Sequence, residues 1–124
     1  MKILSVDDSR TMRNIIHNTV AMLGYGFLEA ENGCAALQVL ASQAKQVGLI
    51  LLDWNMPMMD GMSLLKMLKA DERYRDIPVI MVTTEAEKSR IIDAVRAGAK
   101  HYLTKPFTQE DLVEKISECL DMEL

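Results

Sequence analysis

The sequence has few cysteines, few aromatic residues and no long hydrophobic run. Its 124 residues include two cysteines, Cys34 and Cys119, which are too few for a disulfide framework. Neither has a second cysteine or a histidine at metal-ligand spacing, so we expect both to be buried apolar side chains in a reducing cytoplasm. The longest apolar run, 48–52, stops at Asp53, whereas a membrane-spanning helix needs about 20 apolar residues.

Acidic residues outnumber basic ones, with 18 Asp and Glu against 14 Lys and Arg and a net charge of −4. This balance argues against a nucleic-acid-binding module, which would need a basic face. The proportions of hydrophobic and charged residues, 49% and 26%, are typical of a globular domain, and no linker or repeat interrupts them. We therefore expect one domain over residues 1–124, and we expect it to be cytoplasmic, monomeric and away from membranes.

Short apolar runs alternate with helical patterns along the whole sequence. The expected strands are 3–6, 27–30, 49–52, 79–82 and 102–104, and the expected helices are 10–23, 34–44, 62–68, 88–97 and a last one that begins at 108–111. The third and fourth strands are apolar throughout, as central strands covered on both faces must be. The pattern predicts an α/β fold with a doubly wound, five-stranded parallel sheet of flavodoxin-like order 2-1-3-4-5 and five helices.

Chemically active side chains follow four of these five strands. They are Asp7 and Asp8 after the first strand, Asp53 at the end of the third, Thr83 and Thr84 after the fourth, and Lys105 before Pro106 after the fifth. In an open parallel sheet the carboxyl ends of the strands form the binding crevice at the switch in strand order. We therefore expect three carboxylates, a hydroxyl and an ammonium group to converge at one edge.

Three clustered carboxylates need a cation. Two carboxylates about 4 Å apart repel each other by about 4 kcal/mol at an effective dielectric constant of 20, against a total folding stability of about 5–15 kcal/mol. An oxygen site with few protein ligands suits Mg²⁺, with Mn²⁺ as a possible substitute. Beside Mg²⁺ and Lys105, Asp53 is placed to attack a phosphoryl group, with a hydrogen bond from Thr83 to a transferring oxygen. Asn55 lies two residues after Asp53, so its backbone carbonyl is a candidate metal ligand, and Lys105–Pro106 is a candidate cis peptide bond.

These residues resemble the receiver domain of two-component response regulators. The resemblance rests on Asp7-Asp8, on Asp53-Trp54-Asn55-Met56-Pro57 through Asp60-Gly61, on Val82-Thr83 and on Lys105-Pro106-Phe107, and it covers the whole chain. The segments Asp8-Ser9-Arg10-Thr11-Met12-Arg13 and Thr84-Glu85-Ala86 bring the sequence closest to the single-domain regulators of chemotaxis.

The resemblance implies a role for each matching residue. Asp53 would accept a phosphoryl group from the phosphohistidine of a sensor kinase of the CheA type. Asp8, Asp53 and the Asn55 carbonyl would bind Mg²⁺, and Asp7 would act through a metal-bound water. Lys105 would pair with a phosphoryl oxygen.

The resemblance also implies a switch. Thr83 and Tyr102 would move on phosphorylation and alter the surface of the fourth helix, fifth strand and fifth helix. The partner would be a flagellar motor switch protein (FliM-like) or another phosphorylation-dependent target. A dedicated phosphatase is possible, and the domain would catalyse only its own phosphorylation and dephosphorylation.

Other residues near the site are expected to adjust rates. Thr84 stands where the related chemotaxis pattern has a smaller alanine, so its side chain could narrow access to the phosphoryl group. Asn55 and Glu85 flank the same site. Trp54 is expected to be a partly exposed ring and a useful optical reporter.

Three alternatives remain open. A stand-alone receiver in a phosphorelay would carry the same residues. An aspartyl-phosphate phosphatase would need a general acid two residues after Asp53, where Asn55 stands, and a cap insertion that the sequence does not contain. A flavin-binding protein of this fold would need a phosphate-cradling loop after the first strand, where Asp7 and Asp8 would repel a phosphate.

Overall fold

A computed structural model describes residues 1–120 and confirms the predicted architecture. Five parallel strands form one sheet in the order β2-β1-β3-β4-β5. The strands are Lys2–Val6 (β1), Gly26–Ala30 (β2), Val47–Asp53 (β3), Val79–Thr83 (β4) and His101–Thr104 (β5). The helices are Arg10–Met22 (α1), Gly33–Gln43 (α2), Gly61–Ala70 (α3), Ile91–Arg96 (α4) and Gln109–Leu120 (α5). Within residues 1–120, no helix has the length and apolar character needed to cross a membrane.

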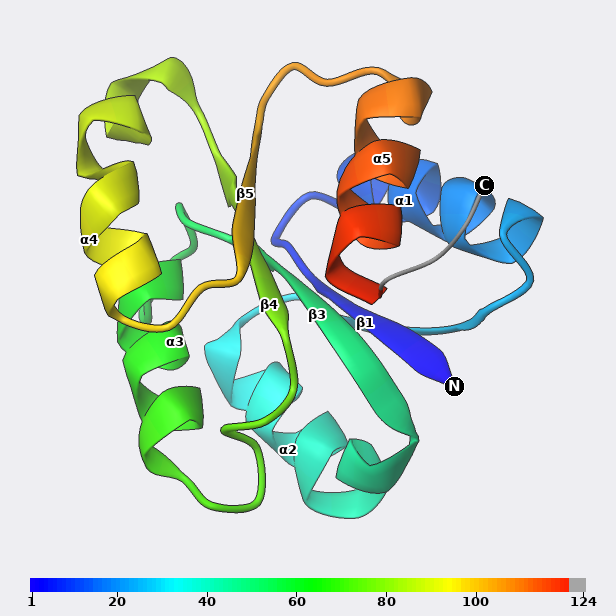
Figure 1. Cartoon of the computed structure of the whole chain (residues 1–124). Coiled ribbons are helices and arrows are strands. Elements are labelled where there is room, and N and C mark those ends of the chain that lie inside the picture. The colour runs from blue at the N-terminus through cyan, green and yellow to red at the C-terminus, as the bar shows by residue number, and fades with distance from the viewer. Residues whose placement is uncertain (121–124) are drawn as a thin grey trace.

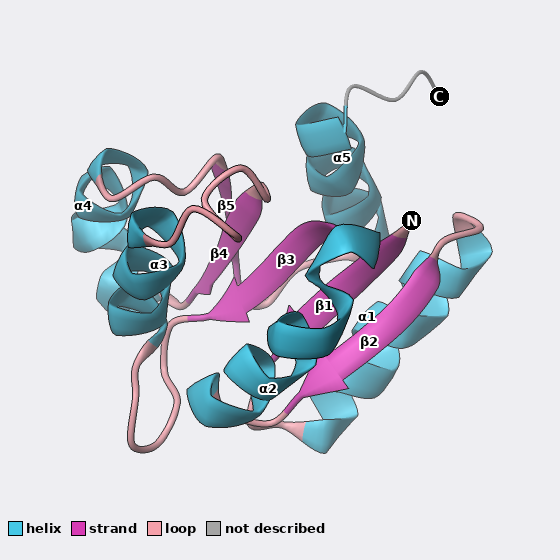
Figure 2. Ribbon diagram, turned by 90° about the horizontal axis from the view of Figure 1, so that it is seen from below, coloured by secondary structure: helices cyan, strands magenta, loops and turns pink. Residues whose placement is uncertain are grey.

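Helices cover both faces of the sheet (Figures 1 and 2). One face packs against α1 and α5, and the other packs against α2, α3 and α4. Alternate residues of each strand point to opposite faces, so Leu49 and Leu51 join the α1/α5 core while Ile50 and Leu52 join the other. Because the central strands are buried on both sides, they have to be apolar at every position.

Local sequence signals set the starts of the helices. The side chains of Ser9, Asn32 and Asp60 each accept a hydrogen bond from a backbone N–H in the first turn of α1, α2 and α3. At the start of α5, Thr108 and Asp111 bond reciprocally, each side chain accepting from the other's N–H at 3.0 Å. This reciprocal pair is a capping box with Asp in place of Glu, and it lies at the predicted start of the last helix, residues 108–111.

Two expectations about the fold are wrong in detail. The fourth helix begins at Ile91 and not at residue 88, because the preceding segment Glu85–Arg90 (η2) is a 3₁₀ helix. The hydroxyl of Thr84, in the N-cap position of that segment, donates to a side chain and caps no backbone N–H. Cys34 is exposed and not buried, because the face of α2 that meets the sheet is carried by residues such as Ala36 and Leu40, whereas Cys119 is buried as predicted.

The loop between β3 and α3 contains a strained methionine. Met58 has φ +68, a left-handed backbone conformation that costs free energy in a residue with a Cβ. Its side chain is 84% exposed, so burial of the side chain does little to offset that cost. Asparagine adopts this conformation more readily than methionine does. We expect Met58→Asn to raise the free energy of unfolding by about 0.5–1 kcal/mol, measured by urea denaturation. A loss of stability would show that the Met58 side chain contributes packing that outweighs the backbone strain.

Candidate phosphoryl-acceptor site

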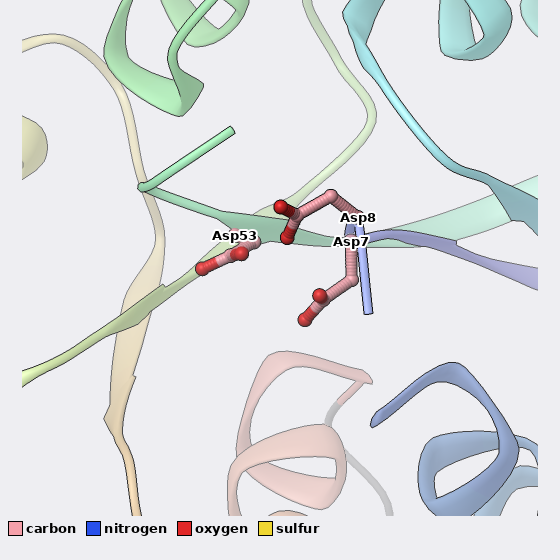
Figure 3. Close-up of side chains that lie close together, drawn as sticks. All are labelled: Asp7, Asp8 and Asp53. Atoms are coloured by element: carbon pink, nitrogen blue, oxygen red, sulfur yellow. The ribbon is translucent and has the colours of Figure 1, made fainter. Parts of the chain in front are cut away.

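Three carboxylates meet at the carboxyl ends of β1 and β3 (Figure 3). Asp7 and Asp8 follow β1, Asp53 ends β3, and one oxygen from each lies within 4.8 Å of the others. Asp7 and Asp53 are buried, whereas Asp8 is exposed and its side chain bends toward Asp53. The two strands are neighbours at the switch in strand order, so the topology itself brings these acids together.

Lys105 supplies a positive charge within this acidic cluster. Its Nζ lies 3.2 Å from Asp7 Oδ2 and 3.4 Å from Asp53 Oδ1. Burial lowers the pKa of the Lys105 ammonium, but the charges of Asp53 and Asp7 outweigh that effect and raise it above its ordinary value. Lys105 is therefore a permanent cation that bridges two buried carboxylates. The Lys105–Pro106 peptide bond is cis, as the sequence suggested.

The Asp7 carboxylate is held in place by the chain around it. Its Oδ1 accepts a hydrogen bond from the Ser9 N–H at 2.8 Å, and its Oδ2 accepts from Lys105. The Arg13 guanidinium donates to the backbone carbonyl of Asp7 at 2.6 Å and pairs with Glu29 at 2.7 Å. Both Asp7 oxygens therefore have protein partners. Asp8 has no hydrogen-bond or ion-pair partner among residues 1–120, so its carboxylate is available to a ligand.

The Asp53 carboxyl titrates at an unusually high pH for an aspartate. Burial is the main cause, followed by the negative charge of Asp7, and together they raise the pKa of Asp53 from 3.8 to about 6. The attraction of Lys105 acts in the opposite direction and is the smaller effect. Ionised Asp53 is thus held at a cost in free energy, which a bound cation would reduce.

Gly61 allows α3 to begin directly against the end of β3. Its N–H donates to the Trp54 carbonyl at 2.8 Å, and a Cβ on Gly61 would lie 2.3 Å from the Asp53 carbonyl oxygen. No side chain larger than hydrogen can be accommodated at that distance. Trp54 itself is 2% exposed, so the expectation of a partly exposed ring is wrong. It packs in the α2/α3/α4 core with the Arg90 guanidinium 5.0 Å from the centre of its ring.

The two predicted switch residues lie on neighbouring strands. Thr83 ends β4 and is fully buried, and its hydroxyl has no hydrogen-bond partner among residues 1–120. Tyr102 lies on β5, half-buried against the α2/α3/α4 core, with Lys115 Nζ 6.0 Å from its ring centre. A buried hydroxyl without a partner costs free energy, so Thr83 has a donor to offer to a new acceptor.

Of the three predicted rate-adjusting residues, the structure connects two. The Asn55 amide and the Thr84 hydroxyl both donate to the carboxylate of Glu87. Glu85 is exposed and lies 3.7 Å from Lys88. The sequence gives no sign that Glu87 is buried, because Glu87 lies in a run of charged residues that is typical of a solvent-exposed surface.

The carboxylate oxygens of Asp7, Asp8 and Asp53 suit a hard divalent cation. The three carboxylates offer oxygens close together, and the free Asp8 carboxylate faces Asp53 at the exposed rim of the cluster. Lys105 neutralises only one of the three negative charges, so a further cation would be bound favourably. The residues present therefore fit Mg²⁺.

Comparison with known proteins identifies the class to which this fold and site belong. The family model described as "Response regulator receiver domain" matches residues 3–117. The chain belongs to the response regulator receiver domain family, a family of signalling switches.

The curated relatives share nearly their whole length with this chain. It is 48% identical over 121 residues to the chemotaxis protein CheY1 of Helicobacter pylori strain J99, covering 97% of both chains. It is 47% identical to a chemotaxis protein CheY homolog of Campylobacter jejuni, covering 97% of this chain and 92% of that protein.

Solved structures agree with the fold. CheY4 of Vibrio cholerae superposes with a TM-score of 0.84 at 32% identity, covering 95% of this chain and 97% of that one. A response regulator receiver domain of Clostridium thermocellum superposes with a TM-score of 0.89 at 28% identity, covering 97% and 94%. Homologues of the chemotaxis type therefore match in both sequence and structure.

Proposed function

We propose that this receiver domain accepts a phosphoryl group on Asp53 and thereby switches a partner-binding surface in chemotaxis. The observation that carries the proposal is the position of the Asp53 carboxylate. It is buried among two other carboxylates, and its Oδ1 lies 3.4 Å from the Lys105 ammonium. A nucleophilic carboxylate next to a fixed cation has the arrangement that phosphoryl transfer requires.

The proposed reaction transfers a phosphoryl group from a phosphohistidine of a CheA-like sensor kinase. An Asp53 oxygen attacks phosphorus, the P–N bond breaks, and the imidazole leaves with the electron pair of that bond. Lys105 stabilises negative charge on the transferring oxygens. Asp8, Asp53 and the Asn55 carbonyl would hold Mg²⁺, with Asp7 acting through water, and the bound ion would neutralise phosphoryl charge in the same place.

The proposed switch begins at the Thr83 hydroxyl. Because this buried donor has no partner within the described part of the chain, residues 1–120, a phosphoryl oxygen on Asp53 would provide one. Tyr102 would then move inward behind Thr83 and alter the surface formed by α4, β5 and α5. The proposed output is binding of a FliM-like flagellar motor switch protein in the cytoplasm, in line with the chemotaxis relatives.

The test is intact mass after incubation with acetyl phosphate and Mg²⁺. We expect one phosphoryl group on the wild-type protein, none on Asp53→Asn and none when Mg²⁺ is chelated beforehand. Glu72→Gln, which changes an exposed acid outside the cluster, is the matched control and should be labelled like the wild type. If hydrolysis removes the label too quickly, the same comparison is made with beryllofluoride. Labelling of Asp53→Asn at the wild-type level would contradict the proposal.

Mg²⁺ is expected to change the fluorescence of Trp54. The ring follows Asp53 directly in the chain, is 2% exposed and lies against Arg90, so a cation at the carboxylates changes the electric field around it. Titration with millimolar Mg²⁺ should change the emission of the wild type and much less that of Asp8→Ala. Glu72→Ala should titrate like the wild type. Identical titrations of wild type and Asp8→Ala would place the metal elsewhere.

A further inference from the structure

Glu87 is a buried carboxylate in a segment whose other charged side chains are exposed. Its relative exposure is 6%, whereas Glu85, Lys88 and Arg90 on the same 3₁₀ segment are exposed. A carboxylate is buried at a high cost unless donors bind its oxygens. The position of Glu87 therefore depends on its hydrogen bonds.

Both oxygens of Glu87 accept a hydrogen bond from a residue next to the site. Oε1 accepts from the Asn55 side-chain amide, and Oε2 accepts from the Thr84 hydroxyl. Asn55 lies two residues after Asp53, and Thr84 comes directly after Thr83. One carboxylate thus joins the loop that follows β3 to the segment that follows β4.

A second contact joins the same two segments. Arg90, three residues after Glu87, places its guanidinium 5.0 Å from the ring centre of Trp54, which directly precedes Asn55. The segment η2 has no side-chain cap of its own at Thr84. The side-chain contacts with Trp54 and Asn55 link this segment to the residues that follow β3.

We infer that Glu87 is a positioning residue that competes with a phosphoryl group on Asp53 for two hydrogen-bond donors. An amide N–H and a hydroxyl are donors that phosphoryl oxygens accept, and here Glu87 holds both. A phosphoryl group that recruits either donor must first break a bond to Glu87. Glu87 thereby favours the unphosphorylated arrangement. This inference rests on the proposed function of Asp53.

Three variants of Glu87 separate its hydrogen bonds from its charge. Glu87→Ala removes both, and Glu87→Asp keeps the charge but shortens the side chain by one methylene. Glu87→Gln keeps the length and one acceptor oxygen, but it loses the charge and replaces the second acceptor by an NH2 donor. Ser89→Ala, an exposed position on the same segment, is the control.

The measurement is the beryllofluoride concentration that gives half-maximal change in Trp54 fluorescence at fixed Mg²⁺, because beryllofluoride mimics the acyl phosphate and is not hydrolysed. We expect Glu87→Ala and Glu87→Asp to bind about threefold to tenfold more tightly than wild type. Glu87→Gln still holds one of the two donors, so it should tighten binding less than Glu87→Ala does, by no more than about threefold. Ser89→Ala should be unchanged. Denaturant midpoints measured in parallel show that each variant is folded.

A purely structural role for Glu87 predicts that its variants bind beryllofluoride more weakly and are also less stable, whereas competition predicts that they bind beryllofluoride more tightly. If Glu87→Ala does not fold, the contrast between Glu87→Asp and Glu87→Gln decides.

Two results would overturn the inference while leaving the proposed function intact. Equal affinity of Glu87→Asp and wild type would show that the two hydrogen bonds do not oppose the phosphorylated state. Equal tightening by Glu87→Gln and Glu87→Ala would assign the effect to charge. A wild type that does not respond to beryllofluoride, or an Asp53→Asn variant that responds like it, would instead refute the proposed function.

Discussion

Replacing Asp53 by asparagine is expected to stabilise the protein at neutral pH when divalent cations are absent. The pKa of Asp53 is raised from 3.8 to about 6, so between these values the folded state holds a proton that the unfolded state releases. Stability therefore falls as the pH rises through this window. Above pH 6 the ionised carboxylate costs up to about 3 kcal/mol, and Asp53→Asn removes that cost.

The measurement is urea denaturation of both proteins in EDTA at pH 4, 5, 6 and 7.5. We expect a gain for Asp53→Asn of about 1–3 kcal/mol at pH 7.5 that shrinks toward zero near pH 4. At that pH the folded Asp53 is protonated and the unfolded carboxyl, with a pKa of 3.8, is only partly ionised, so little of the free-energy cost remains. Asp8→Asn, which changes an exposed carboxylate of the same cluster, should gain less. A gain that does not depend on pH, or a loss, would contradict the assigned ionisation of Asp53.

Replacing Gly61 by alanine is expected to have a comparable effect of opposite sign. The new Cβ would lie 2.3 Å from the Asp53 carbonyl oxygen and 2.9 Å from Trp54 Cα, and backbone atoms cannot rotate away as a side chain can. Either the start of α3 or the end of β3 must move. We expect the free energy of unfolding to fall by about 2–3 kcal/mol, and phosphoryl acceptance to fall with it because Asp53 is displaced.

Gly24→Ala provides the matched control for this variant. Gly24 has φ +85, and no atom would lie within 4 Å of its Cβ, so alanine there introduces backbone strain without a steric clash. It should cost about 1–2 kcal/mol and leave labelling of Asp53 unchanged. If Gly61→Ala loses stability but labels like the wild type, then the close approach of α3 does not position Asp53.

The parts of the fold that followed from the sequence are those set by local patterns. Apolar runs such as Leu49–Leu52 predicted the central strands, and the Thr108–Asp111 pair predicted the start of the last helix. The acids and Lys105 were placed because they stand at strand ends, and parallel strands deliver their carboxyl ends to one edge. These predictions need only the spacing of apolar residues along the sequence and the parallel order of the strands.

The parts that the sequence did not reveal depend on contacts between distant segments. Glu87 lies in a charged stretch, and its burial is explained by hydrogen bonds from the nearby Thr84 and from Asn55, 32 residues away. Trp54 follows a polar site, and its ring is buried because it packs into the α2/α3/α4 core beneath Arg90. No local pattern around either residue indicates these partners.

The pairing of Lys105 with Asp7 has a consequence for how the protein forms during synthesis. The two residues are 98 positions apart, and Lys105 follows β5, the edge strand beside β4. A nascent chain that has emerged only as far as β4 already contains Asp7, Asp8 and Asp53 but lacks the ammonium group that separates two of them. Their mutual repulsion opposes closure of the crevice until the fifth strand is available. The acidic pocket is therefore completed late, once β5 has brought Lys105 to the carboxylates.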